Sequence, residues 1–88
     1  MANAHIVYVL RSISSPQRHY VGITSDVESR LAWHNAGENV FTRDHRPWEV
    51  TVALAFSDPH VAARFARYLK SGSGRAFSKR HFSCDSAR

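Results

Sequence analysis

The sequence predicts an α+β fold in which helices flank a three-stranded antiparallel sheet. Three short runs rich in β-branched and aromatic residues predict the strands, and two segments with apolar residues at helical spacing predict the main helices. The 88 residues allow a single small core, because a chain of this size buries only about 60–65% of its unfolded surface. We therefore expect one domain over residues 1–88, with its core at about 5–82.

The first two strands are predicted to form a hairpin. Residues 6–10 (IVYVL) are apolar at every position, which is typical of a central strand, and residues 19–23 (HYVGI) supply its partner. The segment between them contains a proline and several serines, as expected of a hairpin loop. A register centred near Ser14 would place Tyr8 and Tyr20 opposite each other.

A helix is predicted next, at about residues 26–36. Ser25-Asp26-Val27-Glu28 matches a capping box with Ser25 as the N-cap, and Gly37 suits the position just after a helix. Residues 38–47 have no periodicity, so they predict an exposed basic connector.

The C-terminal half is predicted to add one strand and two helices. In residues 48–56 large apolar residues alternate with smaller or polar ones, which predicts a strand with a single apolar face. Asp58-Pro59 supplies an N-cap followed by proline at the first helical position. That helix should end at residues 71–74, before a short last helix at 76–81. The Ser-Gly-Ser-Gly segment is either a plain connector or a place where backbone N–H groups bind an oxyanion.

The charge of the chain predicts a polyanionic partner. Twelve Lys and Arg against seven Asp and Glu give a formal net charge of +5. Six of these cations lie between residues 64 and 80, where no acidic residue occurs. A solvated helix face normally mixes both signs, whereas Lys and Arg clustered on one element are the pattern expected of phosphate contacts.

The composition excludes several other classes of protein. Cys84 is the only cysteine, which excludes an internal disulfide and a zinc finger. No apolar run approaches the roughly 18 residues of a membrane-spanning helix, and the first residues lack the pattern of a signal peptide. We expect a cytoplasmic protein that does not bind membranes, and no feature predicts a protein partner.

Four polar residues stand out by their spacing on the predicted hairpin and first helix, namely Tyr8, Tyr20, Arg30 and His34. Taken singly, each has an ordinary interpretation as a half-buried strand aromatic or an exposed helix residue. Together they resemble the GIY-YIG nuclease superfamily. Ile6-Val7-Tyr8 stands where that family has Gly-Ile-Tyr, and Tyr20-Val21-Gly22 matches its Tyr-Ile-Gly. Residues 67–77 are similar to the small stand-alone bacterial members.

The resemblance implies a single-metal phosphodiesterase. Tyr8 or Tyr20 would position or deprotonate the attacking water, with His34 as a helper that titrates near neutral pH. Arg30 would stabilise the negative charge that develops on the phosphate. In this family a glutamate on the later helix holds one magnesium or manganese ion.

That glutamate is missing from this sequence. Stand-alone members typically read Phe-Glu-Arg-Tyr-Leu-Lys, and this chain has Ala66 in place of the glutamate. We expect no tight metal binding with Ala66, and binding of Mg²⁺ or Mn²⁺ by an Ala66→Glu form. The family's C-terminal asparagine is also absent, and Ser71 or Ser73 is expected to replace it. Two explanations of Ala66 remain open: a substitution introduced to trap substrate, and a natural loss that leaves a binding protein.

The expected function is metal-dependent endonucleolytic cleavage of DNA, single-stranded DNA before duplex, in a copy that Ala66 inactivates or cripples. Duplex-cutting relatives usually add a recognition domain or dimerise, and one small site with a basic rim suits one strand at a time. Stacking on unpaired bases is expected from Trp33 or Phe77, whereas Trp48 either stacks in the same way or belongs to the core as the first residue of the apolar face of the third strand. The alternatives are a catalytically inactive nucleic-acid-binding module and a small RNA-associated structural protein. The expected nucleic-acid contacts are Arg43, Arg46, Arg67, Lys70, Ser71, Ser73, Arg75 and Lys79.

Overall fold

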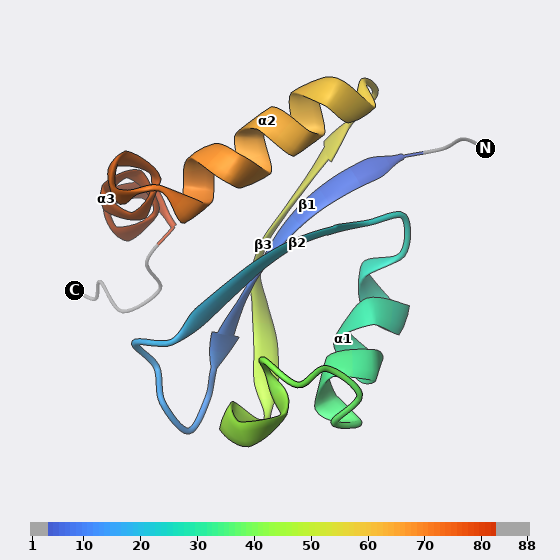
Figure 1. Cartoon of the computed structure of the whole chain (residues 1–88), viewed down its shortest axis with the longest axis vertical. Coiled ribbons are helices and arrows are strands. Elements are labelled where there is room, and N and C mark those ends of the chain that lie inside the picture. Colours follow the sequence, from blue (N-terminus) through green and yellow to red (C-terminus); the bar gives the residue numbers. More distant parts are fainter. Residues whose placement is uncertain (1–3, 83–88) are drawn as a thin grey trace.

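Figure 1 shows the computed structural model, which describes residues 4–82. Its centre is an antiparallel sheet in the order β2-β1-β3, formed by β1 (His5–Ser12), β2 (His19–Thr24) and β3 (Trp48–Phe56). The helical segments are α1 (Val27–Asn35), the short 3-10 helix η1 (Arg43–His45), α2 (Pro59–Lys70) and α3 (Gly72–His81). The predicted α+β fold is confirmed, and the IVYVL run lies in the central strand.

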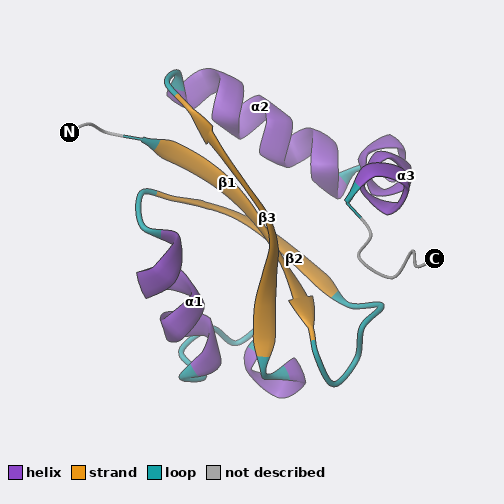
Figure 2. Ribbon diagram, turned by 180° about the vertical axis from the view of Figure 1, so that it is seen from behind, coloured by secondary structure: helices purple, strands orange, loops and turns teal. Residues whose placement is uncertain are grey.

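Helices cover both faces of the sheet, with α1 on one side and α2 and α3 on the other (Figures 1 and 2). Alternate residues of β1 therefore enter two different cores. Val7 and Val9 pack with side chains of α2. Tyr8 and Leu10 pack with Trp48 on the α1 side. Because full burial of one such apolar side chain stabilises the fold by about 1.5–3 kcal/mol, the apolar run of β1 holds both layers together.

The two tyrosines of the hairpin are diagonal neighbours, so the predicted register was wrong. Tyr8 pairs with Gly22, and Tyr20 pairs with Leu10. The tyrosine rings still lie on the same face, with centroids 6.3 Å apart. Glycine is required at position 22 because a Cβ there would lie 2.5 Å from the Tyr8 hydroxyl oxygen. The Tyr8 ring of the first motif therefore occupies the space that a side chain at Gly22, in the second motif, would need.

The β1–β3 ladder contains a bulge at Thr51, because Val9 pairs with Val52 whereas the next residue of β1 pairs with Val50. The Thr51 hydroxyl donates to the Val9 carbonyl oxygen at 3.2 Å. Side chains before the bulge, such as Trp48, face the α1 side, and Val52 packs against the α2 side. The prediction of a single apolar face for this strand was therefore wrong.

The N-cap of α1 is Asp26. The capping-box pattern predicted Ser25 at this position, and that prediction was wrong. The Asp26 carboxylate accepts hydrogen bonds from the Ser29 backbone N–H at 3.1 Å and from the Ser29 hydroxyl at 2.8 Å. A carboxylate is favoured there because it also interacts with the positive end of the helix dipole. Gly37, with φ of 86°, follows the helix end as predicted.

The glycine-rich segment is the first turn of α3 and not a connector, so this helix begins at Gly72 instead of residue 76. Ser71 is its N-cap: the hydroxyl oxygen accepts from the Gly74 N–H at 3.1 Å, and the hydroxyl donates to the Tyr68 carbonyl oxygen at 2.6 Å. A Cβ at position 74 would collide with that carbonyl group, so only glycine allows the two helices to approach so closely.

None of the helices within residues 4–82 is both long and apolar enough to cross a membrane. Cys84, on which the exclusion of a disulfide rested, lies outside the described residues.

Candidate active site

Three buried side chains form a hydrogen-bonded chain at the centre of the candidate site. The Tyr8 hydroxyl lies 3.0 Å from Nε2 of His34, and the other ring nitrogen, Nδ1, lies 2.8 Å from the Thr42 hydroxyl oxygen. Tyr8 is 2% exposed, and the other two are at most 1% exposed. Because both ring nitrogens of His34 have partners, the orientation of the imidazole is fixed.

Burial sets the protonation of this chain. It raises the pKa of Tyr8 to about 12, an effect that the neighbouring Tyr20 strengthens and the Arg30 charge opposes. Burial also lowers the pKa of His34, and the Arg30 charge acts in the same direction. Near neutral pH Tyr8 is therefore a protonated phenol and His34 a neutral imidazole. Both pKa shifts oppose transfer of the Tyr8 proton to His34, so the hydrogen bond between them serves to orient the two side chains.

Tyr20 connects this buried chain with the surface. Its ring centroid lies 4.7 Å from that of His34, and its side chain is half-buried and lines a groove. Of the two candidate tyrosines, Tyr20 is therefore the one that a bound molecule can touch directly.

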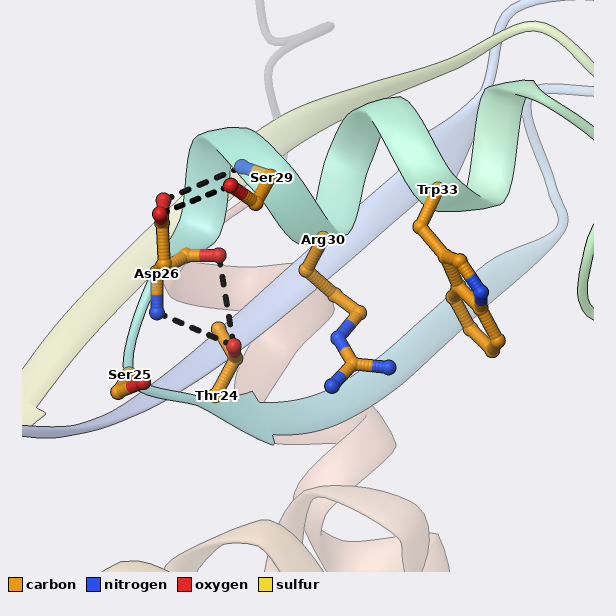
Figure 3. Close-up of a pocket in the computed structure, with 6 residues that line it drawn as sticks. All are labelled: Thr24, Ser25, Asp26, Ser29, Arg30 and Trp33. Carbon is orange, nitrogen blue, oxygen red and sulfur yellow. Dashed lines mark hydrogen bonds between the residues drawn. The ribbon is translucent and has the colours of Figure 1, made fainter.

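Arg30 lies on the same helix as His34, at the surface. Its guanidinium carbon lies 4.8 Å from the centre of the Trp33 ring, in a shallow pocket of about 400 Å³ (Figure 3). Asp26 shares this pocket, but hydrogen bonds from the Ser29 backbone N–H and hydroxyl already engage its carboxylate and hold its pKa below the usual range. The stacking on Trp33 orients the guanidinium for an anionic group.

A groove of about 1090 Å³ lies between the hairpin turn and the adjoining ends of α2 and α3. No Asp or Glu within residues 4–82 lines it. Such a groove suits the phosphates of a nucleic acid. One of the cations that line the groove, Arg11, also donates a hydrogen bond to Glu49 Oε2 at 2.7 Å, so its charge is partly balanced. The cations that line the groove are Arg11, Arg18, Lys70, Arg75 and Lys79.

The structure divides the predicted nucleic-acid contacts between several places. Three of them line the groove, namely Lys70, Arg75 and Lys79. Arg67 is exposed on α2 outside the groove. Ser71 is occupied by the cap of α3, and Ser73 is exposed in the first turn of that helix; neither lines the groove.

Arg43 and Arg46 lie in the segment between α1 and β3, away from the groove. Both are exposed, and Arg46 Nε donates to the Arg43 carbonyl oxygen at 2.7 Å. The guanidinium of Arg46 covers Gly37. The predicted basic connector is therefore folded back on the end of α1.

Only one of the three predicted stacking residues presents much of its ring. Trp33 is 36% exposed. Phe77 is half-buried against Tyr68 and Phe82. Trp48 is buried in the core, and its Nε1 donates to the Thr42 carbonyl oxygen at 2.7 Å, so of its two interpretations the core position is confirmed.

Ala66 lies in the core between α2 and the sheet, on the face opposite Tyr8. Leu69, one helical turn further on, lines the groove together with Tyr20. A longer side chain at position 66 would therefore start from the α2 side of the sheet, among the apolar residues of that core. Within residues 4–82 no group of three or more His, Cys, Asp or Glu could hold a metal ion. No Asp or Glu among the described residues lines the groove, so the groove itself offers no carboxylate to magnesium or manganese.

Three residues of the site were missed in the sequence, namely Arg11, Arg18 and Thr42. Thr42 lies in a connector without periodicity, and only the folding of that connector against α1 brings its hydroxyl to His34. Arg18 lies in the hairpin turn, and tertiary structure brings it beside α3. Its position two residues before Tyr20 was the one available signal.

The burial of His34 predicts a pH-dependent stability. The folded-state pKa lies below the ordinary value of 6.5, so below about pH 6.5 the unfolded chain binds a proton that the folded state excludes. The free energy of unfolding should fall as the pH drops from 7.5 to 5.5, by up to about 1.4 kcal/mol per pH unit from this group. Urea unfolding of the wild type and of His34→Gln at several pH values measures the contribution of His34 to this pH dependence. If the free energy of unfolding depended on pH identically in both proteins, the prediction would be contradicted.

A basic groove that includes a tyrosine, together with a surface arginine in a separate pocket, is typical of a domain that handles phosphodiesters. The chain belongs to the GIY-YIG family, since residues 4–81 match the family model of the GIY-YIG catalytic domain. The resemblance seen in the sequence is thereby confirmed.

Individual relatives agree with this assignment. The chain is 36% identical over 72 residues to a UPF0213 protein of Natronomonas pharaonis, covering 81% of this chain and 82% of that protein. It is 34% identical over 86 residues to the structure-specific endonuclease subunit SLX1 of Candida dubliniensis, covering 90% of this chain but only 29% of that protein. The solution NMR structure of a UPF0213 protein from Bacillus halodurans has the same fold, with a TM-score of 0.56, 24% identity, and coverage of 93% and 89% of the two chains.

Proposed function

We propose that the chain is a GIY-YIG-type DNA endonuclease domain that binds single-stranded DNA in preference to duplex, and that Ala66 cripples its cleavage. The observation that supports this most directly is the groove: cations line it, no carboxylate of the described residues does, and Tyr20 lies where it meets the buried Tyr8–His34 pair. A cytoplasmic location, next to DNA, is part of the proposal.

The burial of the side chains suggests how they share the work. Arg30 and Tyr20 reach the surface and would contact the scissile phosphate, with the always-protonated guanidinium stabilising its developing charge. The Tyr8 hydroxyl, behind them, stays protonated and is held in place by its hydrogen bond with neutral His34. Thr42 would act as a positioning residue, because it fixes the His34 ring. Magnesium or manganese would bind an active Ala66→Glu form, and neither would bind tightly to the form with Ala66.

The absence of a carboxylate at position 66 also supports a second function, that of a nucleic-acid-binding module without catalysis. The groove explains binding equally well in both cases. A buried Tyr–His–Thr chain, however, serves no purpose in binding phosphates, which favours the nuclease.

The groove predicts salt-dependent binding. Log affinity for a fluorescent single-stranded oligonucleotide should fall linearly with log salt concentration, because phosphate contacts release counterions. The Arg75→Ala/Lys79→Ala variant should reduce this slope by about 1 per lost contact, or about 2 in total. The matched variant Arg64→Ala/Arg80→Ala removes two cations of the same segment that do not line the groove, so its slope should change less. If both double variants reduced the salt slope equally, the groove would not be the nucleic-acid interface.

A further inference from the structure

Val40 and Phe41 are the most exposed large apolar side chains within residues 4–82, at 59% and 79%. They lie in the segment between α1 and η1, shown in green in Figure 1. Exposing an aromatic ring to this extent costs the stabilisation that its burial would give. The ring of Phe41 makes no contribution to either core.

The backbone that carries Phe41 is held in place. The side-chain oxygen of Asn39 accepts from the Phe41 N–H at 2.7 Å, and its carbonyl oxygen accepts from the Thr42 N–H at 3.2 Å. Thr42 is itself fixed by its contact with His34 and by the hydrogen bond that its carbonyl oxygen accepts from Trp48. A ring on such a support can bind a partner without the entropic cost of ordering a loop.

Contacts place Phe41 at the far end of the site from the groove. Tyr20 lines the groove and touches the His34 ring, and His34 in turn contacts Thr42, whose chain neighbour is Phe41. The groove is bounded by α2 and α3, whereas this segment follows α1 on the other side of the sheet (Figures 1 and 2). Because β2 is an edge strand, a nucleic-acid strand that leaves the groove past Tyr20 and β2 reaches the α1 side of the sheet, where this segment lies.

We propose that Phe41 is a stacking platform for one unpaired base on the far side of the site, an inference that rests on the proposed binding of single-stranded DNA. Aromatic rings stack on any unpaired base. Two acids of the surrounding segment balance its two arginines, so this contact is made through the ring and not through phosphate charge. The balanced residues are Glu38, Arg43, Asp44 and Arg46.

The test is a binding assay with single-stranded oligonucleotides in which an abasic site is moved one position at a time. With the wild type, one position distant from the groove-bound segment should weaken binding by about 5-fold or more, the range expected for one stacked base. Phe41→Leu keeps the apolar side chain but removes the aromatic face. It should weaken binding of the intact oligonucleotide by the same factor, lose sensitivity at that position, and leave the salt slope unchanged.

Two further variants make the assay specific. Phe41→Trp should retain wild-type affinity, and its fluorescence should be quenched when the oligonucleotide binds. Ile13→Ala, at an exposed apolar residue of the hairpin turn, should leave the abasic-site profile unchanged.

The results separate this inference from the proposed function. If the wild type binds but Phe41→Leu gives the same affinity and abasic-site profile, the inference is overturned and the proposed function stands. It is also overturned if Phe41→Leu only converts a dimer to a monomer in size-exclusion chromatography with DNA affinity unchanged, which would make the segment a self-association surface. Absence of any oligonucleotide binding by the wild type would overturn both.

Discussion

Ala66→Glu is expected to give the protein metal-dependent nuclease activity that the Ala66 form lacks. Magnesium is usually held by one or two carboxylates together with a substrate phosphate. No Asp or Glu of the described residues lines the groove, and the carboxylate of the adjacent Glu49 is engaged by Arg11. A glutamate at position 66 would extend from the helix that borders the groove and supply a carboxylate oxygen. Labelled single-stranded and duplex oligonucleotides, incubated with magnesium or manganese, should be cut only by the variant, and a chelator should abolish the cleavage.

The buried position of Ala66 predicts that Ala66→Glu lowers the stability of the fold, an effect that the sequence did not indicate. Glutamate is nearly as good a helix former as alanine, which predicted an undisturbed fold. Ala66 is only 5% exposed among apolar neighbours, so without metal the glutamate should lower stability, by roughly 1–3 kcal/mol if its polar end stays unpaired.

Ala66→Gln is the matched control, because it places a side chain of the same size at the same site without a charge. It should fold and bind DNA but cut nothing. A folded Ala66→Glu protein that binds DNA and cleaves none of a varied set of substrates would leave the binding module as the better function. Efficient cleavage by the Ala66 form would show that position 66 is not the metal position.

Arg30→Ala, made in the cleaving Ala66→Glu background, should reduce turnover by about 10²–10³, the usual effect of removing one donor that stabilises a developing charge. Affinity for the oligonucleotide should fall much less, because the interaction strengthens in the transition state. Single-turnover cleavage rates and equilibrium binding, measured on the same substrate, separate the two effects.

Arg30→Lys is the informative control. The ammonium group keeps the charge but loses the planar fork and its stacking on Trp33, so it should restore only part of the rate. Equal losses in affinity and turnover for Arg30→Ala would instead mean that the guanidinium only binds phosphate in the ground state.

The sequence by itself determined the class of fold and pointed to most residues of the candidate site. Strand and helix positions follow from local periodicity, which the chain shows clearly in the IVYVL run and in the segment after Asp58. The tyrosine, arginine and histidine positions follow from spacing within the hairpin and one helix, where a few residues fix the relative geometry.

The tertiary structure decided how these elements are joined. Strand register depends on the turn and on pairing with a distant strand, so the diagonal placement of Tyr8 and Tyr20 and the bulge at Thr51 could not be read locally. The groove brings the hairpin turn beside α2 and α3, and the partner of His34 comes from a connector without periodicity, Thr42. These contacts join residues far apart in sequence, and only the packing of helices on both faces of one sheet brings them together.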